Sequence, residues 1–212
     1  MAFVICARGY NYSTAEKKFH GALEYLRISD MAKFVVDSLE DAEEKITIVI
    51  AEDSENMYAH PKGKPGSSGG IIVWNPESSL RVVNTKAYFW NKKQTISPFL
   101  ALFHEMGHAY QYLSETEGYL KFKKEQKEKK HERNILEDTN VAALENTVAR
   151  ELRSSKKWEG IRWKYEDLVP LTKKESESAM QQSNLTTNIF GAFDYMNKKG
   201  TLPDKSIKFK PK

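Results

Sequence analysis

The chain has 212 residues and a formal net charge of +4, and 40% of its residues are hydrophobic, including 10 Phe, 10 Tyr and 4 Trp. This composition supports a packed core and excludes a wholly disordered chain, and the length favours one domain, residues 1–197, followed by a basic and flexible tail at 198–212. Neither an apolar run of roughly 18 residues nor the features of a Sec-type signal occur, so no membrane span and no such signal are expected.

The positive charge is concentrated in two segments. Residues 121–133 carry seven Lys or Arg against three Glu, and residues 198–212 carry six Lys against one Asp. These segments contribute +4 and +5, which leaves −5 for the rest of a chain whose total is +4. Nucleic-acid grooves interleave aromatic with basic side chains, so a solvated helix face or tail is the better explanation and no nucleic-acid partner is expected.

The N-terminal part of the chain predicts two helices between two strands. Residues 3–7 are expected to form a short strand or an extended lead-in, in which the single Cys6 is expected to be a buried small hydrophobe. The capping box Ser13-Thr14-Ala15-Glu16 opens a helix to about Arg27, and a second helix covers residues 29–43. Residues 45–51 (KITIVIA) are rich in β-branched side chains and predict a strand.

Further strands and helices are expected on either side of a central motif. Residues 61–70 (PKGKPGSSGG) cannot be regular structure, whereas 71–74 and 80–84 are typical of neighbouring antiparallel strands joined by a turn. A charged stretch lies at 115–135. Beyond it we expect a helix at 139–153, a Trp-rich patch at 158–165 and a helix at about 176–196.

The central motif lies in a helix predicted for residues 97–113. Ser97 followed by Pro98 is typical of an N-cap and a first helical position, and apolar residues then recur at helical spacing. Inside the helix stands His104-Glu105-Met106-Gly107-His108, the HExxH pattern of zinc metallopeptidases. Residues four apart share a helix face, so both imidazoles can bind one metal ion, with Glu105 beside them as general base.

The two histidines lie apart from the apolar stripe of this helix. With His104 at 0° and about 100° per residue, His108 falls near 40° and the stripe is centred near 200°. Histidines that only fill a core would lie within the stripe, so the pattern favours metal binding over a structural role. The stripe consists of Phe99, Leu102, Phe103, Met106, Tyr110 and Leu113.

A catalytic zinc site needs a third protein ligand and an open position for water. The extended HExxHxxGxxH pattern is absent, because Gln111 and Ser114 stand where Gly and His are required. Glu145 is the predicted third ligand: in the helix at 139–153 it falls within the apolar arc, where a carboxylate is costly unless it is paired, protonated or metal-bound. That arc contains Val141, Leu144, Val148 and Leu152.

Other roles for these acids remain open from the sequence. Glu145 can instead pair with Arg150 or Arg162, since buried acids are commonly ion-paired. Glu137 is the alternative third ligand. Asp138 is a further alternative, although Asp138 or Thr139 is expected to cap the following helix.

Taken together, these residues resemble the NleD-like zinc metallopeptidases of bacterial effectors and polymorphic toxins. The likeness covers about residues 65–166 and keeps the order of the family's features. Arg150 stands one position from the family's arginine, and residues 154–160 resemble an insertion. The matching features are Gly-Gly-Ile-Ile-Val-Trp-Asn-Pro at 69–76, Leu-Phe-His-Glu-Met-Gly-His-Ala at 102–109, Glu145-Asn146, Arg150-Glu151-Leu152 and Arg162 with Tyr165.

The resemblance implies an α+β fold, a compact single-domain zincin with a small, mainly antiparallel sheet packed on the HExxH helix and further helices. It implies an endopeptidase with one Zn²⁺ per chain and a protein or peptide substrate, host signalling proteins being one class in the family. Tyr165, or alternatively Arg162, would donate to the oxyanion, and strand 71–74 is a candidate edge for an extended peptide. The alternatives are that Tyr165 is a core residue and that residues 71–74 form an internal strand with no substrate role. Such a protein is secreted or injected as an effector or toxin, and otherwise cytoplasmic.

The competing interpretation is a non-catalytic metal-binding protein whose basic segments dock an acidic partner or a membrane surface. A fourth protein ligand, such as His131, would favour it; otherwise His131 is expected to be solvated. Glu105 has no role in a purely structural site, and this favours the enzyme. No oligomeric state is predicted.

Overall fold

The computed structural model describes residues 3–62, 68–82, 94–128, 135–155, 157, 159–161, 168–171 and 175–176. It confirms the α+β class. The elements in chain order are β1 (Phe3–Arg8), α1 (Tyr12–Leu26), α2 (Asp30–Glu40), β2 (Ile46–Ala51), β3 (Met57–Ala59), β4 (Gly70–Trp74), β5 (Leu80–Val82), β6 (Gln94–Ile96), α3 (Pro98–Ser114), α4 (Thr116–Glu128), α5 (Ile135–Thr139), the π-helical turn η1 (Asn140–Glu145), α6 (Asn146–Ser154) and β7 (Leu168–Pro170).

A four-stranded sheet with the order β1-β2-β4-β3 forms the first layer. β1 pairs with β2 and β2 with β4 in parallel, whereas β3 runs antiparallel to β4, so this sheet is mixed. Parallel neighbours need a long crossover, which α1 and α2 provide between β1 and β2. In β2 the predicted β-branched strand is confirmed, and its alternate residues Ile46, Ile48 and Ile50 are fully buried.

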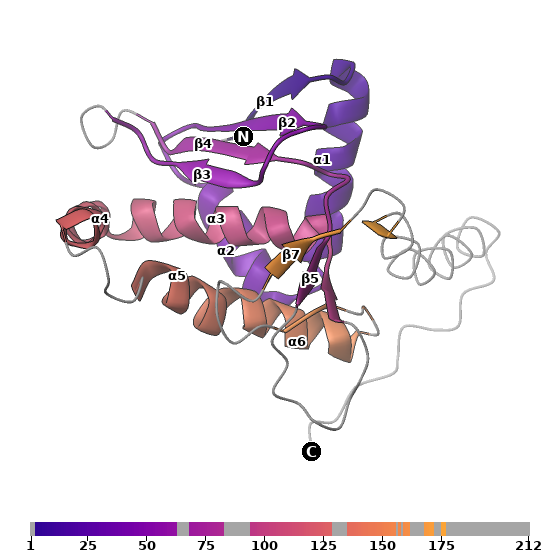
Figure 1. Ribbon diagram of the computed structural model, residues 1–212. Coiled ribbons are helices and arrows are strands. Elements are labelled where there is room, and N and C mark those ends of the chain that lie inside the picture. Colours follow the sequence, from indigo (N-terminus) through magenta and orange to yellow (C-terminus); the bar gives the residue numbers. More distant parts are fainter. Residues whose placement is uncertain are drawn as a thin grey trace, which may run out of the picture.

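The helices lie on one face of the sheet, and α3 is the middle layer (Figure 1). α3 contacts β3 and β4 on one side and η1 on the other, while α1 and α2 also pack against it. The Trp74 indole N–H at the end of β4 donates to the Pro98 carbonyl oxygen at 2.8 Å and so ties the sheet to the first turn of α3. Side chains on two faces of α3 are therefore shielded from water.

Two predictions about the strands are wrong. Residues 71–74 and 80–84 do not form a hairpin, because β4 already pairs with β2 and β3, and β5 belongs to a second, antiparallel sheet of order β6-β5-β7. Cys6 is exposed rather than buried. Side chains alternate along a strand, and β1 turns Phe3 towards the helices and Cys6 to the opposite face.

The helix boundaries differ slightly from those predicted. α1 begins at Tyr12, because the side chain of Asn11, rather than Ser13, accepts the Thr14 N–H at 2.8 Å and forms the N-cap. Asp138 does not cap a later helix, since it lies within the first turn of α5. Across the described residues, no helix combines the length and apolar character that a membrane crossing requires.

Candidate metal centre

The centre is built on α3, whose predicted start and HExxH placement are confirmed. Ser97 is the N-cap, accepting the Leu100 N–H at 3.2 Å, and Pro98 occupies the first helical position. The helix continues without interruption past both histidines to Ser114. His104 and His108 are only 5% and 4% exposed, because α5 and η1 cover the face that carries them.

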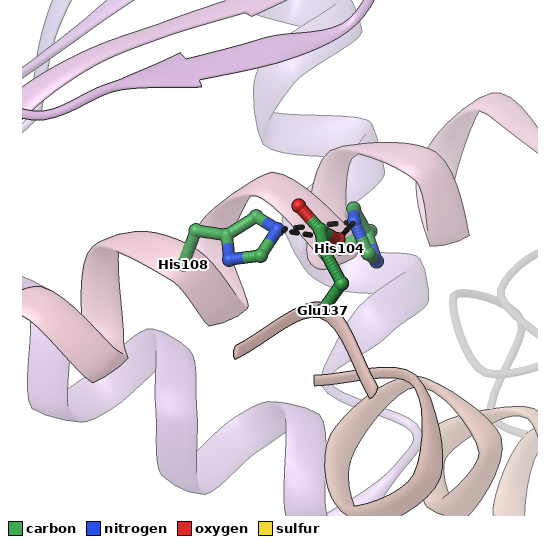
Figure 2. A group of neighbouring side chains, drawn as sticks. All are labelled: His104, His108 and Glu137. Carbon is green, nitrogen blue, oxygen red and sulfur yellow. Dashed lines mark hydrogen bonds and ion pairs between the residues drawn. The ribbon is translucent and has the colours of Figure 1, made fainter. Parts of the chain in front are cut away.

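Glu137 of α5 meets both imidazoles. Figure 2 shows its carboxylate beside the two rings. Glu137 Oε2 lies 3.2 Å from Nε2 of His104 and 3.1 Å from Nε2 of His108, and the two Nε2 atoms are 3.2 Å apart. The three atoms therefore form a nearly equilateral triangle that joins two elements separated by α4 in the chain.

This triangle fits a tetrahedral metal ion. Ligand atoms at about 2.0–2.1 Å from a tetrahedral ion stand about 3.3 Å from one another. The observed separations of 3.1–3.2 Å are close to that value, and two imidazoles with one carboxylate are a common catalytic donor set. The group His104, His108 and Glu137 can therefore bind a metal ion.

The outer nitrogens of both rings have acceptors that fix their protons. Nδ1 of His104 lies 2.8 Å from Oε2 of Glu145, and Nδ1 of His108 lies 3.2 Å from Oε1 of Gln111. Both oxygens can only accept, so each Nδ1 can donate a proton to its partner, and in that tautomer, with a metal ion bound, each Nε2 would be the ligand atom. Such outer partners orient a metal-binding histidine and raise its basicity.

Two buried acids, Glu105 and Glu145, and the partly buried Glu137 give the centre a negative field. Burial alone would lower the pKa of His104, but hydrogen bonds to Glu137 and Glu145 raise that pKa to about 9. Burial alone would raise the pKa of Glu137, but its hydrogen bonds to the two imidazoles hold that pKa well below its usual range. The negative field of these acids thus favours a positive charge at the point where Nε2 of His104, Nε2 of His108 and Oε2 of Glu137 converge.

Glu105 lies beside this triangle and contacts the sheet. Burial raises the pKa of its carboxyl group, while the two neighbouring imidazoles and a hydrogen bond from the Tyr58 backbone N–H of β3 act in the opposite direction. The carboxylate is thus held between α3 and the edge strand. A raised pKa suits a group that must both accept and release a proton near neutral pH.

The sequence of this chain matches one protein family over most of its length. Residues 11–155 match the sequence profile of the Peptidase M91 family, which is described as an effector protein family. The chain belongs to this family. No curated protein and no solved structure matches the chain significantly. The membership confirms the resemblance seen in the sequence, and the match extends further towards the N-terminus, so that it includes α1, α2 and the strands β2, β3 and β4, while β1 precedes it.

In this Peptidase M91 chain four predicted residues of the centre, His104, Glu105, His108 and Glu145, come together with the alternative ligand Glu137. Glu137 faces the Nε2 atoms of both histidines, whereas Glu145 bonds to His104 from the Nδ1 side. The other predicted participants, Arg162, Tyr165 and His131, lie outside the described residues, and the family match ends before Arg162 and Tyr165.

Gln111 and Asn140 also contact the histidines, and the sequence analysis assigned neither of them to the site. Gln111 stands one helical turn after His108, so its place on the same face of α3 was a usable signal. Asn140 donates to the His104 carbonyl oxygen at 2.7 Å from a different helical segment, and no sequence spacing indicates such a contact.

A buried carboxylate also fixes the N-terminal end of α3. Glu159 accepts the Ser97 backbone N–H at 3.0 Å, the Ser97 hydroxyl at 2.6 Å and the Tyr25 hydroxyl at 2.5 Å. Burial raises the pKa of Glu159, and its hydrogen bonds to Ser97 and Tyr25 oppose that rise. Residues after α6 thereby hold the helix that carries the HExxH motif to α1.

Proposed function

We propose that this chain is a zinc-dependent endopeptidase in which His104, His108 and Glu137 hold one Zn²⁺ and Glu105 is the general base. The observation that carries the proposal is the triangle of ligand atoms, 3.1–3.2 Å apart, with a buried glutamate next to it that is not needed as a ligand. Membership in a peptidase effector family supports a protein substrate and action inside a target cell after injection.

Glu137 replaces Glu145 as the third ligand in this proposal. The Nδ1 and Nε2 lone-pair directions of an imidazole diverge, so an oxygen that accepts from Nδ1 points away from an ion bound at Nε2. Glu145 Oε2 is 2.8 Å from Nδ1 of His104, whereas Glu137 Oε2 is within 3.2 Å of both Nε2 atoms. Three protein ligands leave the open position that a catalytic site requires.

The chemistry follows from the side chains around that open position. When bound, zinc lowers the pKa of a water molecule and polarises the scissile carbonyl group. Glu105 accepts the proton of the attacking water and then delivers it to the leaving amine. Tyr165 remains the proposed oxyanion donor, with Arg162 as the alternative.

We assign the substrate to β3 rather than to strand 71–74. β4 contains residues 71–74 and is paired on both sides, by β2 and by β3, so it offers no free edge. β3 is the end strand of the sheet order, and its Tyr58 N–H reaches Glu105. An extended peptide added to β3 would run past the general base with its main chain hydrogen-bonded to the protein.

Cleavage of proteins in a lysate of candidate target cells tests the proposal. New protein N-termini should appear after incubation with the full chain, vanish when a chelator is added and return when zinc, but not magnesium, is restored. A chelator-insensitive pattern would contradict zinc catalysis. Metal binding without any new N-termini would support the non-catalytic alternative, in which the basic segments dock an acidic partner or membrane.

A further inference from the structure

Glu137 and Glu145, which meet His104, come from one helical rod, α5–η1–α6 (Figure 1). The middle of this rod, η1, is π-helical rather than α-helical. The backbone N–H of Asn146 bonds to the Val141 carbonyl oxygen, five residues back, instead of the oxygen four residues back. Such a turn holds one residue more than an α-helical turn, and π-helical turns of this kind occur frequently at functional sites. The directions in which the side chains of α6 point, relative to Glu137, therefore differ from those in an uninterrupted α-helix.

The extra residue decides where Glu145 points. In a regular α-helix, Asn140 and Glu145 are five residues apart and would face directions about 140° apart. With one residue absorbed by the widened turn, Glu145 takes the direction of a residue four positions after Asn140, only about 40° away. Both side chains then face α3, and they are 0% and 1% exposed.

The contacts on His104 show what these two side chains do. Glu145 Oε2 is 2.8 Å from Nδ1 of the ring, and Asn140 Nδ2 donates to the His104 backbone carbonyl oxygen at 2.7 Å. Asn140 Oδ1 is buried without a hydrogen-bond partner among the described residues, which is costly. Tight packing keeps it there, because a Cβ atom on Gly107 would lie 2.0 Å from that oxygen.

We propose that η1 is a positioning device for the metal centre, in which the widened turn aims Glu145 at Nδ1 of His104 while Asn140 and Gly107 fix the rod against α3. Glu145 is a positioning residue: it accepts the Nδ1 proton, fixes the ring's orientation and leaves Nε2 free for the ion. The inference rests on the proposed metal centre, and it assigns a role to the π-helical geometry.

The first test measures metal affinity of the full chain by competition with a chromophoric zinc chelator. Glu145→Ala should weaken zinc binding about 10- to 100-fold, the range typical of lost outer partners, and Glu145→Gln should recover part of it because its amide oxygen still accepts from Nδ1. Glu137→Gln is the matched comparison, and it should be the more damaging of the two Gln variants. Equal losses for both would overturn the positioning role and make Glu145 a ligand.

The second test uses one-residue changes in η1 itself. Ala143 is exposed and lies inside η1, so deleting it takes one residue out of the widened turn without removing a buried side chain. Deleting it should let the rod become regular with Glu145 still facing His104, so affinity should change less than about threefold. Adding one alanine after Ala143 should rotate Glu145 by about 100° and match Glu145→Ala. In an ordinary helix both changes would be equally harmful, and that result would overturn the proposal.

The outcomes separate this inference from the proposed function. If the unaltered chain binds no zinc, the metal centre itself is wrong. If it binds zinc and neither Glu145→Ala nor the added alanine weakens binding, only the role of η1 fails. Circular dichroism of each variant, compared with Ala143→Gln, distinguishes a lost contact from a lost fold. The cobalt-substituted protein provides a second readout, since its absorption bands should shift when the His104 ring is no longer fixed.

Discussion

The two helical segments that form the metal centre differ in how they present their side chains. α3 is a regular α-helix, and the spacing of four residues between His104 and His108 is enough to place both rings on one face. The α5–η1–α6 rod contains a π-helical turn, so its acids follow no single helical period. The HExxH motif can be recognised in the sequence because its geometry is local and regular. The positions of the acids that meet it depend on an irregular backbone and on tertiary packing.

The two segments also divide the chemistry. In the proposed mechanism α3 supplies two ligands and the general base, while the rod supplies the third ligand and the acceptor that fixes His104. Changes in α3 at Glu105 should therefore affect turnover with the metal still bound. Changes in the rod should affect metal affinity first. The predictions below test this division.

The largest effect is expected for Glu105→Gln. The amide keeps the size of the side chain but cannot accept the proton of the attacking water, so kcat should fall by about 10²- to 10⁴-fold. Zinc content should stay at one per chain, because Glu105 is not among the three proposed ligands. Turnover of a cleaved peptide and metal analysis of the same sample check both parts. A loss of zinc together with activity would indicate that Glu105 is a ligand, and it would contradict the proposed division of roles between α3 and the rod.

Gly107→Ala should have the next largest effect, because it forces the two segments apart. The new Cβ would lie 2.0 Å from Asn140 Oδ1, and moving Asn140 would also break its 2.7 Å bond to His104. We expect a loss of about 1–3 kcal/mol in the free energy of unfolding, as for other overpacked sites, together with weaker zinc binding.

Gly21→Ala in α1 is the matched control for that substitution. A Cβ there meets nothing within 4 Å, so the better helix propensity of alanine should leave stability equal or up to about 1 kcal/mol higher. Denaturant unfolding of both variants gives the comparison. Equal stability of the two alanine variants would show that α3 and η1 do not require close approach at Gly107.

Much of the fold follows from local patterns, and the errors arise where pairing is non-local. The β-branched run of β2 and the Ser97-Pro98 start of α3 depend on neighbouring residues, and the structure has these elements. The hairpin predicted after β4 fails because β2 and β3, distant in sequence, already occupy both of its edges. The prediction that Cys6 is buried is wrong for a related reason. The described helices cover only one face of the four-stranded sheet (Figure 1), and Cys6 is exposed.

The candidate site divides in the same way. The helical spacing of α3 identified His104, Glu105 and His108, and the apolar arc correctly indicated that Glu145 is buried. The arc was calculated with about 100° per residue throughout. It therefore could not include a π-helical turn, in which a backbone N–H bonds to the carbonyl oxygen five residues back. Burial of an acid therefore could be predicted, but which nitrogen of His104 it meets could not.

The smallest effect is expected for Gln111→Ala, and it compares the supports of the two rings. Gln111 accepts from Nδ1 of His108 at 3.2 Å and donates to the Leu136 carbonyl oxygen at 3.1 Å, so it is a neutral and partly exposed counterpart of Glu145. Hydrogen bonds between neutral groups contribute about 0.5–1.5 kcal/mol, against about 1.5–3 kcal/mol where one group is charged.

Because water can replace a partly exposed acceptor but not a buried one, zinc affinity should fall only a few-fold in Gln111→Ala, well below the loss in Glu145→Ala. Zinc titrations of both variants measure the difference. A loss as large in Gln111→Ala would mean that the regular helix and the widened turn support the centre equally, and that the charge and burial of Glu145 add nothing to the position of its imidazole.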